Sequence, residues 1–433
     1  MVKRIYRIFL GLIVLLAAAV IIYNLPPVHS RLAWRVDELT ARIRYAIKPP
    51  EKAIFVPQGH LTATLLSTLL PLTPSSTPTT QPSTTPTHPP NLPTPTVTLT
   101  FTPSPSPTAI PGKATLAGIV HEYQKMNNCG PANLAMALSF WKWQGTQVDT
   151  AAYLKPNQDD KNVMPYEMAD YVTTQTNLKI VVRLGGDIQT LKRLIAAGYP
   201  VIVEKGFEGS SFPGWMGHYE VLSGYDDGQA VFTAQDSYEG PNRPVAYDTM
   251  ISNWRAFDFI FLVIYPPENE SDVLAILGPL ADEQAAFEHS AQVALDETGT
   301  LKDRDLYFAW FNRGSSLVKL GDYGGAAAAY DQAFSVYPNI AEAKRPWRML
   351  WYQTGPYFAY YYTGRYNDIV SLATQSLDAA NIPTLEESYV WRARAEVMLG
   401  QRDKAIEDLR LALKYHPGFE AALVDLQQLG VSP

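Results

Sequence analysis

The chain has a single cysteine, Cys129, among its 433 residues. An intramolecular disulfide is therefore excluded, and a packed hydrophobic core has to hold the fold together. Hydrophobic residues make up 46% of the chain, which is enough for such a core, and the length suits about two or three domains. A lone cysteine is either a small buried hydrophobic residue or a reactive thiol.

Positive charge is scarce as well. Lys and Arg number 35 against 42 Asp and Glu, which gives a formal net charge of −7. Nucleic-acid binding needs clustered basic residues, so we expect no nucleic acid as a partner. The sequence also lacks the spacings of zinc ligands and the glycine-rich loops that hold nucleotides. We therefore expect no metal and no organic cofactor.

The N-terminus carries one long apolar run, residues 9–23, preceded by three basic residues. Counted from Ile5, the segment has about 19 residues and reaches about 28 Å as a helix, close to the hydrocarbon thickness of a bilayer. No small-x-small cleavage site follows, so residues 1–29 predict a retained membrane anchor rather than a cleaved signal peptide. We expect the bulk of the chain outside the cytoplasm, because the preceding tail is very short and the linker that follows resembles an exported one.

The next segments differ in composition. Residues 30–72 begin with an amphipathic helix at 30–48, whose apolar stripe suits either a stalk beside the membrane or a dimerising coiled coil. Residues 73–112 are mostly Pro, Thr and Ser with almost no charge, which predicts an extended spacer. Folded sequence resumes with residues 113–267, and residues 268–433 are helical in pattern.

Residues 113–267 mix helical and strand periodicities. Three amphipathic segments predict helices, at 131–141, 166–176 and 187–197. Four runs rich in apolar residues predict strands, at 201–204, 218–225, 229–236 and 257–265. Helices followed by an antiparallel sheet indicate an α+β domain.

Residues 268–433 contain a repeating register of small residues and turns. One copy comprises Gly314, Gly321, Tyr323, Ala326, Tyr330, Ala333 and Pro338; another comprises Ala393, Gly400, Arg402, Ala405, Leu409, Ala412 and Pro417. A looser copy lies between them. These offsets resemble the tetratricopeptide repeat of about 34 residues, which predicts an all-α repeat domain. Most of its Tyr and Trp side chains are expected to pack between helices; a groove that binds a peptide is the functional hypothesis.

Cys129 lies at the start of the first predicted helix, with Pro131 in the first turn. A thiol at this place feels the positive end of the helix dipole, which lowers its pKa. Gln124, five residues earlier, offers an amide donor for the oxyanion of a tetrahedral intermediate. The alternatives are a buried structural cysteine and a surface glutamine.

A general base near neutral pH should be a histidine, and the domain contains only His121 and His218. His121 lies in a segment without a clear pattern. His218 lies in the run Gly-His-Tyr-Glu-Val-Leu-Ser-Gly-Tyr, which predicts a strand, so we take His218 as the base. The alternative is a histidine at the edge of a sheet without a catalytic role.

The strand of His218 ends in Asp-Asp-Gly, a hairpin signal. If residues 226–228 are the loop, Tyr225 pairs with Gln229, and His218 then faces Asp236 with Cβ atoms about 5 Å apart. Asp236 would accept a hydrogen bond from the imidazole and fix its tautomer. A loop one residue shorter would spoil this pairing.

Together these pieces resemble the peptidase C39-like group of the papain-like cysteine peptidases. The resemblance covers about residues 115–265 and rests on Gln124 followed by Asn-Asn-Cys-Gly-Pro-Ala, on Gly-His-Tyr, and on an Asp after a short strand. It implies Cys129 as nucleophile, His218 as base and Asp236 as orienting residue, with Gln124 as oxyanion donor. Well-known members are fused to ABC transporters and cut after a Gly-Gly pair. This chain has no Walker A motif, so that substrate is not carried over.

The sequence thus predicts an α+β papain-like peptidase domain followed by an all-α tetratricopeptide-like domain, behind an N-terminal transmembrane helix. The predicted function is extracytoplasmic cleavage of a peptide or protein substrate, with repeats that bind the substrate or a protein partner. Two other functions stay open: a catalytically silent peptide-binding scaffold, and a cell-wall amidase or transpeptidase with the same thiol chemistry.

Overall fold

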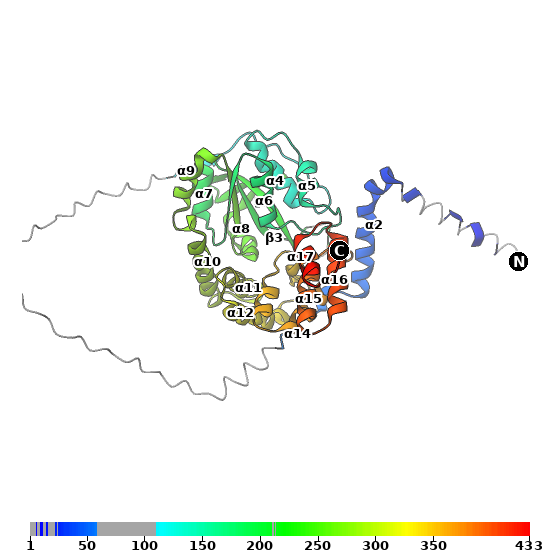
Figure 1. Cartoon of the computed structure of the whole chain (residues 1–433). Helices are drawn as coiled ribbons and strands as arrows, with labels where there is room; N and C mark the ends of the chain where they lie inside the picture. The colour runs from blue at the N-terminus through cyan, green and yellow to red at the C-terminus, as the bar shows by residue number, and fades with distance from the viewer. Residues whose placement is uncertain are drawn as a thin grey trace, which may run out of the picture.

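The computed structural model describes residues 25–58, 110–209, 212 and 214–433, with a few more before residue 25 (Figure 1). Most of the predicted anchor and almost all of the Pro/Thr/Ser-rich segment lie outside these described residues. Among the helices that are described, none is both long and apolar enough to cross a bilayer.

The predicted amphipathic segment forms helix α2 (Pro26–Ile47), which lies beside the repeat domain (Figure 1). Arg44 donates to the backbone oxygens of Asp378 and Asn381, the latter at 3.3 Å. The apolar stripe of α2 is exposed at Leu39 and Ile43. The structure contains one chain, so the predicted choice between a stalk and a dimerising coiled coil stays open.

A seven-stranded sheet forms the centre of the first domain, with strand order β2-β7-β3-β4-β5-β6 and β1 paired to β4. Every pairing in it is antiparallel. The strands are β1 (Lys113–Thr115), β2 (Lys179–Arg183), β3 (Val201–Phe207), β4 (Met216–Asp226), β5 (Val231–Asp236), β6 (Gly240–Ala246) and β7 (Phe261–Tyr265). All four predicted strands are present, and β1, β2 and β6 were not expected.

Helices cover both faces of this sheet. They are α4 (Cys129–Phe140), α5 (Gln147–Leu154), α6 (Pro165–Gln175), α7 (Ile188–Ala196) and α8 (Tyr247–Trp254). Strand alternation sends Ile202 towards α4 and α6, and its neighbours Val201 and Val203 towards α7 and α8. The three predicted helices are present. The Asp187 side chain caps α7, as expected, by accepting a hydrogen bond from the N–H of Thr190 at 2.6 Å.

The predicted register of the β4–β5 hairpin is wrong. Tyr225 pairs with Phe232 rather than with Gln229, so the loop is the four residues 227–230. A bulge at Ser223 then moves the register back by one residue. The predicted contact between the histidine and the aspartate therefore has to arise in another way.

The second domain consists of helices only: α9 (Glu270–Leu277), α10 (Glu283–Thr298), α11 (Asp303–Lys319), α12 (Tyr323–Val336), α13 (Gly355–Tyr362), α14 (Tyr366–Ala379), α15 (Glu386–Met398), α16 (Arg402–Tyr415) and α17 (Glu420–Gln428). Three helical hairpins turn at Gly321, Gly364 and Gly400, each with φ of 75° or 76°. Gly314 is required for close packing, because a Cβ there would lie 2.7 Å from the ring of Tyr330. An irregular segment, residues 337–352, separates the first two hairpins and explains the looser copy.

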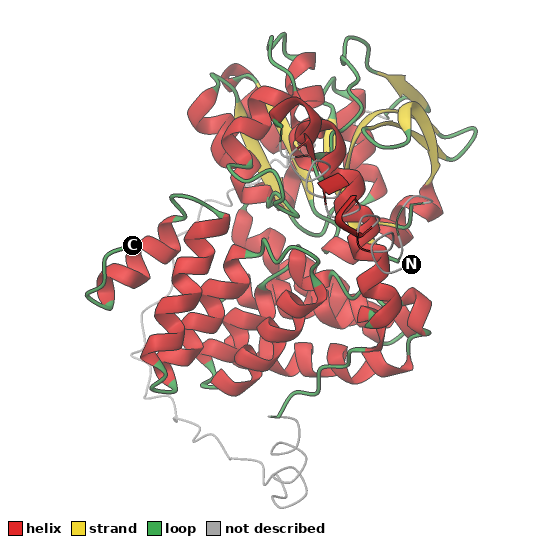
Figure 2. Ribbon diagram, turned by 90° about the vertical axis from the view of Figure 1, so that its right-hand side faces the viewer, coloured by secondary structure: helices red, strands yellow, loops and turns green. Residues whose placement is uncertain are grey.

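The two domains share a hydrophobic core, and Figure 2 shows the sheet-containing domain lying against the helical one. Trp215 and Phe257 of the first domain stack on each other, and Tyr352 of the second domain packs edge-on against Trp215. Below them, the carboxylate of Asp258 accepts hydrogen bonds from two serines of the helical domain, Ser290 and Ser316, at 2.6 Å each. The repeats are therefore packed onto the sheet-containing domain rather than merely linked to it.

Candidate active site

Cys129 is the first residue of α4, as predicted, and its side chain is half-buried. The N-cap residue, Asn128, makes no side-chain cap in the described structure, so the first N–H groups of the helix are not satisfied in that way. The helix start is held instead by Asn133, whose amide donates to the backbone oxygens of Cys129 at 2.9 Å and Tyr219 at 2.7 Å. The dipole and these N–H groups make the site suited to negative charge.

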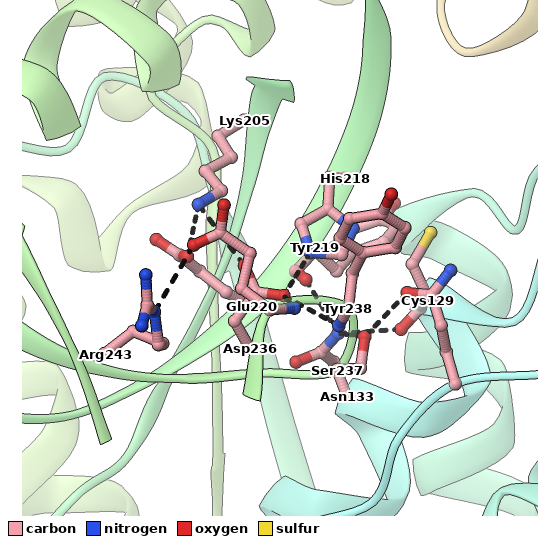
Figure 3. Close-up of polar contacts among 12 residues, drawn as sticks. Cys129, Asn133, Lys205, His218, Tyr219, Glu220, Asp236, Ser237, Tyr238 and Arg243 are labelled. Atoms are coloured by element: carbon pink, nitrogen blue, oxygen red, sulfur yellow. Dashed lines mark hydrogen bonds and ion pairs between the residues drawn. The ribbon is translucent and has the colours of Figure 1, made fainter. Parts of the chain in front are cut away.

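His218 lies on β4 next to this helix start, and only 3% of it is exposed. Its imidazole lies close enough to the thiol of Cys129 for the two groups to shift each other's pKa. Its Nε2 atom lies 2.9 Å from Oδ1 of Asp236, which leaves Nδ1 for the thiol. Figure 3 shows the thiol on one side of the imidazole and the carboxylate on the other. The structure thus brings these three predicted residues together.

Asp236 ends β5, and backbone groups fix its orientation. Its Oδ1 accepts hydrogen bonds from the N–H groups of Tyr238 at 2.7 Å and Glu239 at 2.9 Å, in addition to the imidazole. A carboxylate that accepts several N–H bonds stays ionised and cannot rotate freely. Asp236 therefore presents a fixed negative charge to the buried imidazole.

The three groups shift one another's pKa values. Burial alone would raise the pKa of the Cys129 thiol, but the hydrogen bond and the charge of His218 outweigh it, and the pKa is lowered. Burial opposes the charged imidazole, yet the hydrogen bonds to Asp236 and Cys129 raise the pKa of His218 to about 9. The pKa of Asp236 is lowered despite its burial, chiefly by His218. These shifts favour a thiolate and an imidazolium over the neutral pair.

A second pair of buried charges lies behind the aspartate. Lys205 of β3 pairs directly with Glu220 of β4, and its Nζ atom lies 3.6 Å from Oδ2 of Asp236 (Figure 3). Burial lowers the pKa of Lys205, but the two carboxylates outweigh this effect and raise it. Lys205 thus keeps a positive charge next to the second oxygen of Asp236.

Gln124 lies beside the site in a network that fixes its amide. The hydroxyl of Ser237 donates to Oε1 of Gln124 at 2.8 Å, and the N–H of Gln124 donates to the backbone oxygen of Ser237 at 2.8 Å. Asn133 in turn donates to the Ser237 hydroxyl at 3.0 Å. Because Oε1 is held as an acceptor, the Nε2 donors of Gln124 are left to point elsewhere.

Aromatic rings pack against the imidazole. Phe207 stacks on His218 with centroids 4.8 Å apart, and Tyr238 stands edge-on to Phe207 at 5.1 Å. Phe212 contacts both rings, at 5.5 and 6.1 Å. The other histidine, His121, lies near the site but contacts the backbone oxygen of Asp236 through Nε2 at 3.0 Å rather than a reacting group.

Several site residues were missed by the sequence analysis, namely Lys205, Glu220, Asn133, Ser237 and the aromatic cover. One signal was available: Glu204 and Lys205 interrupt an otherwise apolar strand. Charged residues in a buried strand have to be paired, so they indicate a polar site nearby.

The comparisons with known proteins agree with the two resemblances. Residues 117–260 match the model of the Peptidase_C39 like family, and residues 307–340 match that of the tetratricopeptide repeat. Among solved structures, a C39-like peptidase from Bacillus anthracis is 16% identical with a TM-score of 0.30, covering 35% of this chain and 96% of its own. A double glycine motif protease from an AMS/PCAT transporter, in complex with the leader peptide, is 16% identical with a TM-score of 0.28, covering 35% and 94%. No curated protein matches. The predicted recognition of both domains is confirmed.

Proposed function

We propose that this chain, with its C39-like domain and its tetratricopeptide repeats, is a cysteine peptidase. Cys129 is the nucleophile, His218 the acid and base, and Asp236 the residue that orients the imidazole. The observation that carries the proposal is the buried imidazole of His218, which lies beside the thiol on one side and is hydrogen-bonded to a fixed carboxylate on the other. This is the geometry of an activated nucleophile.

The reaction follows from these positions. The Cys129 thiolate attacks the peptide carbonyl carbon, a C–S bond forms, and the carbonyl oxygen becomes an oxyanion. Nε2 of Gln124 and the N–H groups at the start of α4 are the donors we assign to that oxygen. As the C–N bond breaks, the imidazolium of His218 protonates the leaving amine. Water then attacks the thioester, His218 takes its proton, and the acid and the thiol are released.

The aromatic cover supports a peptide as the substrate. Phe207, Phe212 and Tyr238 form a wall next to His218, so apolar side chains of a bound peptide would find ring surfaces there. A cell-wall amidase or transpeptidase would use the same thiol. Peptide cleavage is preferred because these ring surfaces suit apolar side chains.

We also propose that residues 1–29 anchor the chain in a membrane and that both folded domains lie outside the cytoplasm. The apolar run 9–23 and the basic residues before it support this placement. Protease added to intact cells should then degrade the peptidase and repeat domains, and alkaline washing should leave the chain in the membrane fraction. A chain that is protected in intact cells, or that washes off, contradicts the proposal.

The proposed activity is tested with the purified full chain on a peptide library and, separately, on cell-wall fragments. We expect the wild type to cut peptides and Cys129→Ala and His218→Ala to cut none. His289→Ala, which changes an exposed histidine far from this chemistry, should leave cleavage unchanged. Cleavage that survives in Cys129→Ala contradicts the proposal, and cleavage of wall fragments alone would favour the amidase.

A further inference from the structure

Residues 49–58, here called the N-terminal strap, lie on the repeat domain. Along residues 54–58 burial alternates with a period of two: Phe55 and Pro57 are buried, whereas Ile54, Val56 and Gln58 are exposed. An extended peptide held by one of its faces shows this pattern. The strap is therefore bound in the manner of a peptide ligand.

The anchor of the strap is Phe55, which is 6% exposed. Its ring stands edge-on to Phe334 of α12 at 4.9 Å and lies 6.2 Å from Tyr360 of α13. The floor and walls around it are made of repeat side chains, including Tyr307, Tyr337, Leu350, Leu372 and Ser376. These residues and the strap together line one groove of the repeat domain, called the strap groove.

Polar contacts hold the strap at both ends. Arg345 donates to the backbone oxygen of Glu51 at 2.8 Å, and the N–H of Gln58 donates to Oδ1 of Asp368 at 2.8 Å. Asp368 is itself fixed by Arg365 of the same domain at 2.8 Å. Side chains of the repeats thus form hydrogen bonds with backbone groups of the strap, as in the recognition of extended peptides.

The backbone of the strap is preset for this role. Residues 50–52 form one short 3₁₀ helix, and the residues on either side of it are near the polyproline II region: Pro49 has φ −62° and ψ 120°, and Ala53 has φ −70° and ψ 126°. Proline at positions 49, 50 and 57 restricts the unbound segment, which lowers the entropy lost on binding.

The same surface connects the strap to the catalytic domain through Arg348, which is 4% exposed. Its Nη1 donates to the backbone oxygen of Trp215 at 2.9 Å, three residues before His218. Its guanidinium lies 3.8 Å from the ring of Trp347, and it is hydrogen-bonded to the side chain of Tyr45 just before the strap. One buried cation thus contacts the N-terminal segment, the repeats and the catalytic domain.

From these contacts we propose that the helical repeats are a peptide-binding module whose ligand is the strap of the same chain. The occupant is the strap in cis because Tyr45 and Arg348 continue the contact into the catalytic domain of the same molecule. The repeats consequently join the N-terminal segment to the peptidase. An outside peptide reaches the groove only by displacing the strap, and it has to be extended, with an aromatic residue two positions before a proline. This proposal does not depend on the catalytic activity.

The test uses the full chain with a site for a sequence-specific protease inserted within residues 73–109, purified in mild detergent because residues 9–23 are apolar. After cutting, size-exclusion chromatography shows whether the fragment with the strap stays bound to the fragment with both domains. We expect the wild-type fragments to co-elute, and an excess of a synthetic peptide of residues 45–58 to separate them. Phe55→Ala should dissociate at least about tenfold faster, since a central aromatic anchor is lost.

Val56→Ala is the matched control, because Val56 is a neighbour that is 66% exposed. It should behave as the wild type does. The fragment with both domains has the same sequence in all variants, so a difference in retention comes from the strap rather than from the domains. Complete separation of the cut wild type, or equal retention of the two variants, overturns the proposal. Two differently tagged chains can also be mixed and then cut. Complexes that join the strap fragment of one chain to the domain fragment of the other would assign the strap to a second copy and overturn the cis assignment.

Discussion

His218 and Asp236 lie on adjacent strands but not directly opposite each other. Val221 pairs with Gln235, so continuing this register places Glu220 opposite Asp236 and His218 two residues further along the same face. The 2.9 Å contact between Nε2 and Oδ1 is therefore diagonal. The four-residue loop alone would put the two side chains on opposite faces. The bulge at Ser223 shifts the register by one residue and so returns both side chains to the same face of the sheet.

Asp236→Asn should lower the pH at which the imidazolium of His218 loses its proton, which is the upper pH limit of the thiolate–imidazolium pair. Asp236 is the main charge that raises the pKa of His218 to about 9, and an amide cannot replace it. We expect this limit to fall by about one pH unit or more and peptide cleavage at neutral pH to fall at least about tenfold. The measurement is the pH dependence of cleavage, with the exposed Asp248→Asn as control. An unchanged upper limit would show that Asp236 does not act on the imidazole.

Lys205→Met should destabilise the fold more than a double change does. The single variant leaves Glu220 and Asp236 as buried carboxylates without their cation, which costs about 3–5 kcal/mol. Lys205→Met with Glu220→Met replaces the pair by apolar groups and should recover most of the loss. Denaturant unfolding measures both. A double variant as unstable as the single one would rule out this pairing as the cause.

Gln124→Ala should separate cleavage from thiol reactivity. Loss of an oxyanion donor lowers the rate of peptide cleavage by about 10²-fold or more. Alkylation of Cys129 forms no oxyanion, so its rate should stay within about twofold of the wild type. Ser237→Ala, which frees Oε1 of Gln124, should give a smaller loss in the same direction. Gln144→Ala, at an exposed glutamine, is the control and should change neither rate. Equal losses of cleavage and alkylation in Gln124→Ala would mean that Gln124 supports the thiol rather than the oxyanion.

Stability should fall as pH rises from 5 to 8. Burial raises the pKa values of Asp160, Asp258 and Glu386 to about 7. Between about pH 4 and pH 7 the native state holds protons that the unfolded chain has released, so stability is lost as pH rises through this window. The pair of His218 and Cys129 changes this trend little, because the raised pKa of His218 acts in the same direction and the lowered pKa of Cys129 acts in the opposite one.

Thermal unfolding at several pH values tests this expectation. The midpoint should drop by about 3 °C or more between pH 5 and pH 8, and Asp258→Asn should reduce the drop. Asn tolerates the left-handed φ of 54° at this position and can still accept a hydrogen bond from a serine. A midpoint that rises with pH would contradict the assignment of these buried carboxylates.

Local signals in the sequence were sufficient for part of the site. The start of a helix at Cys129, a strand through His218 and the glycine turns of the repeats each depend on nearby residues. The hairpin register was not predictable, because a bulge at Ser223 carries no composition signal. The pairing of β3 with β4, which brings Lys205 behind Asp236, is a long-range contact. The strap lacked any periodicity and binds a surface more than 200 residues away in the sequence.

The central claim is that the only thiol forms an ion pair with His218, and it is tested most directly by the pH dependence of alkylation. Because Cys129 is the single cysteine, iodoacetate reports on it alone. We predict a bell-shaped rate that is already high at pH 6 and falls near pH 9, where the imidazolium loses its proton. His218→Ala should abolish the bell. A wild-type rate that rises once, near the pKa of about 8.5 of a free cysteine, would contradict the account.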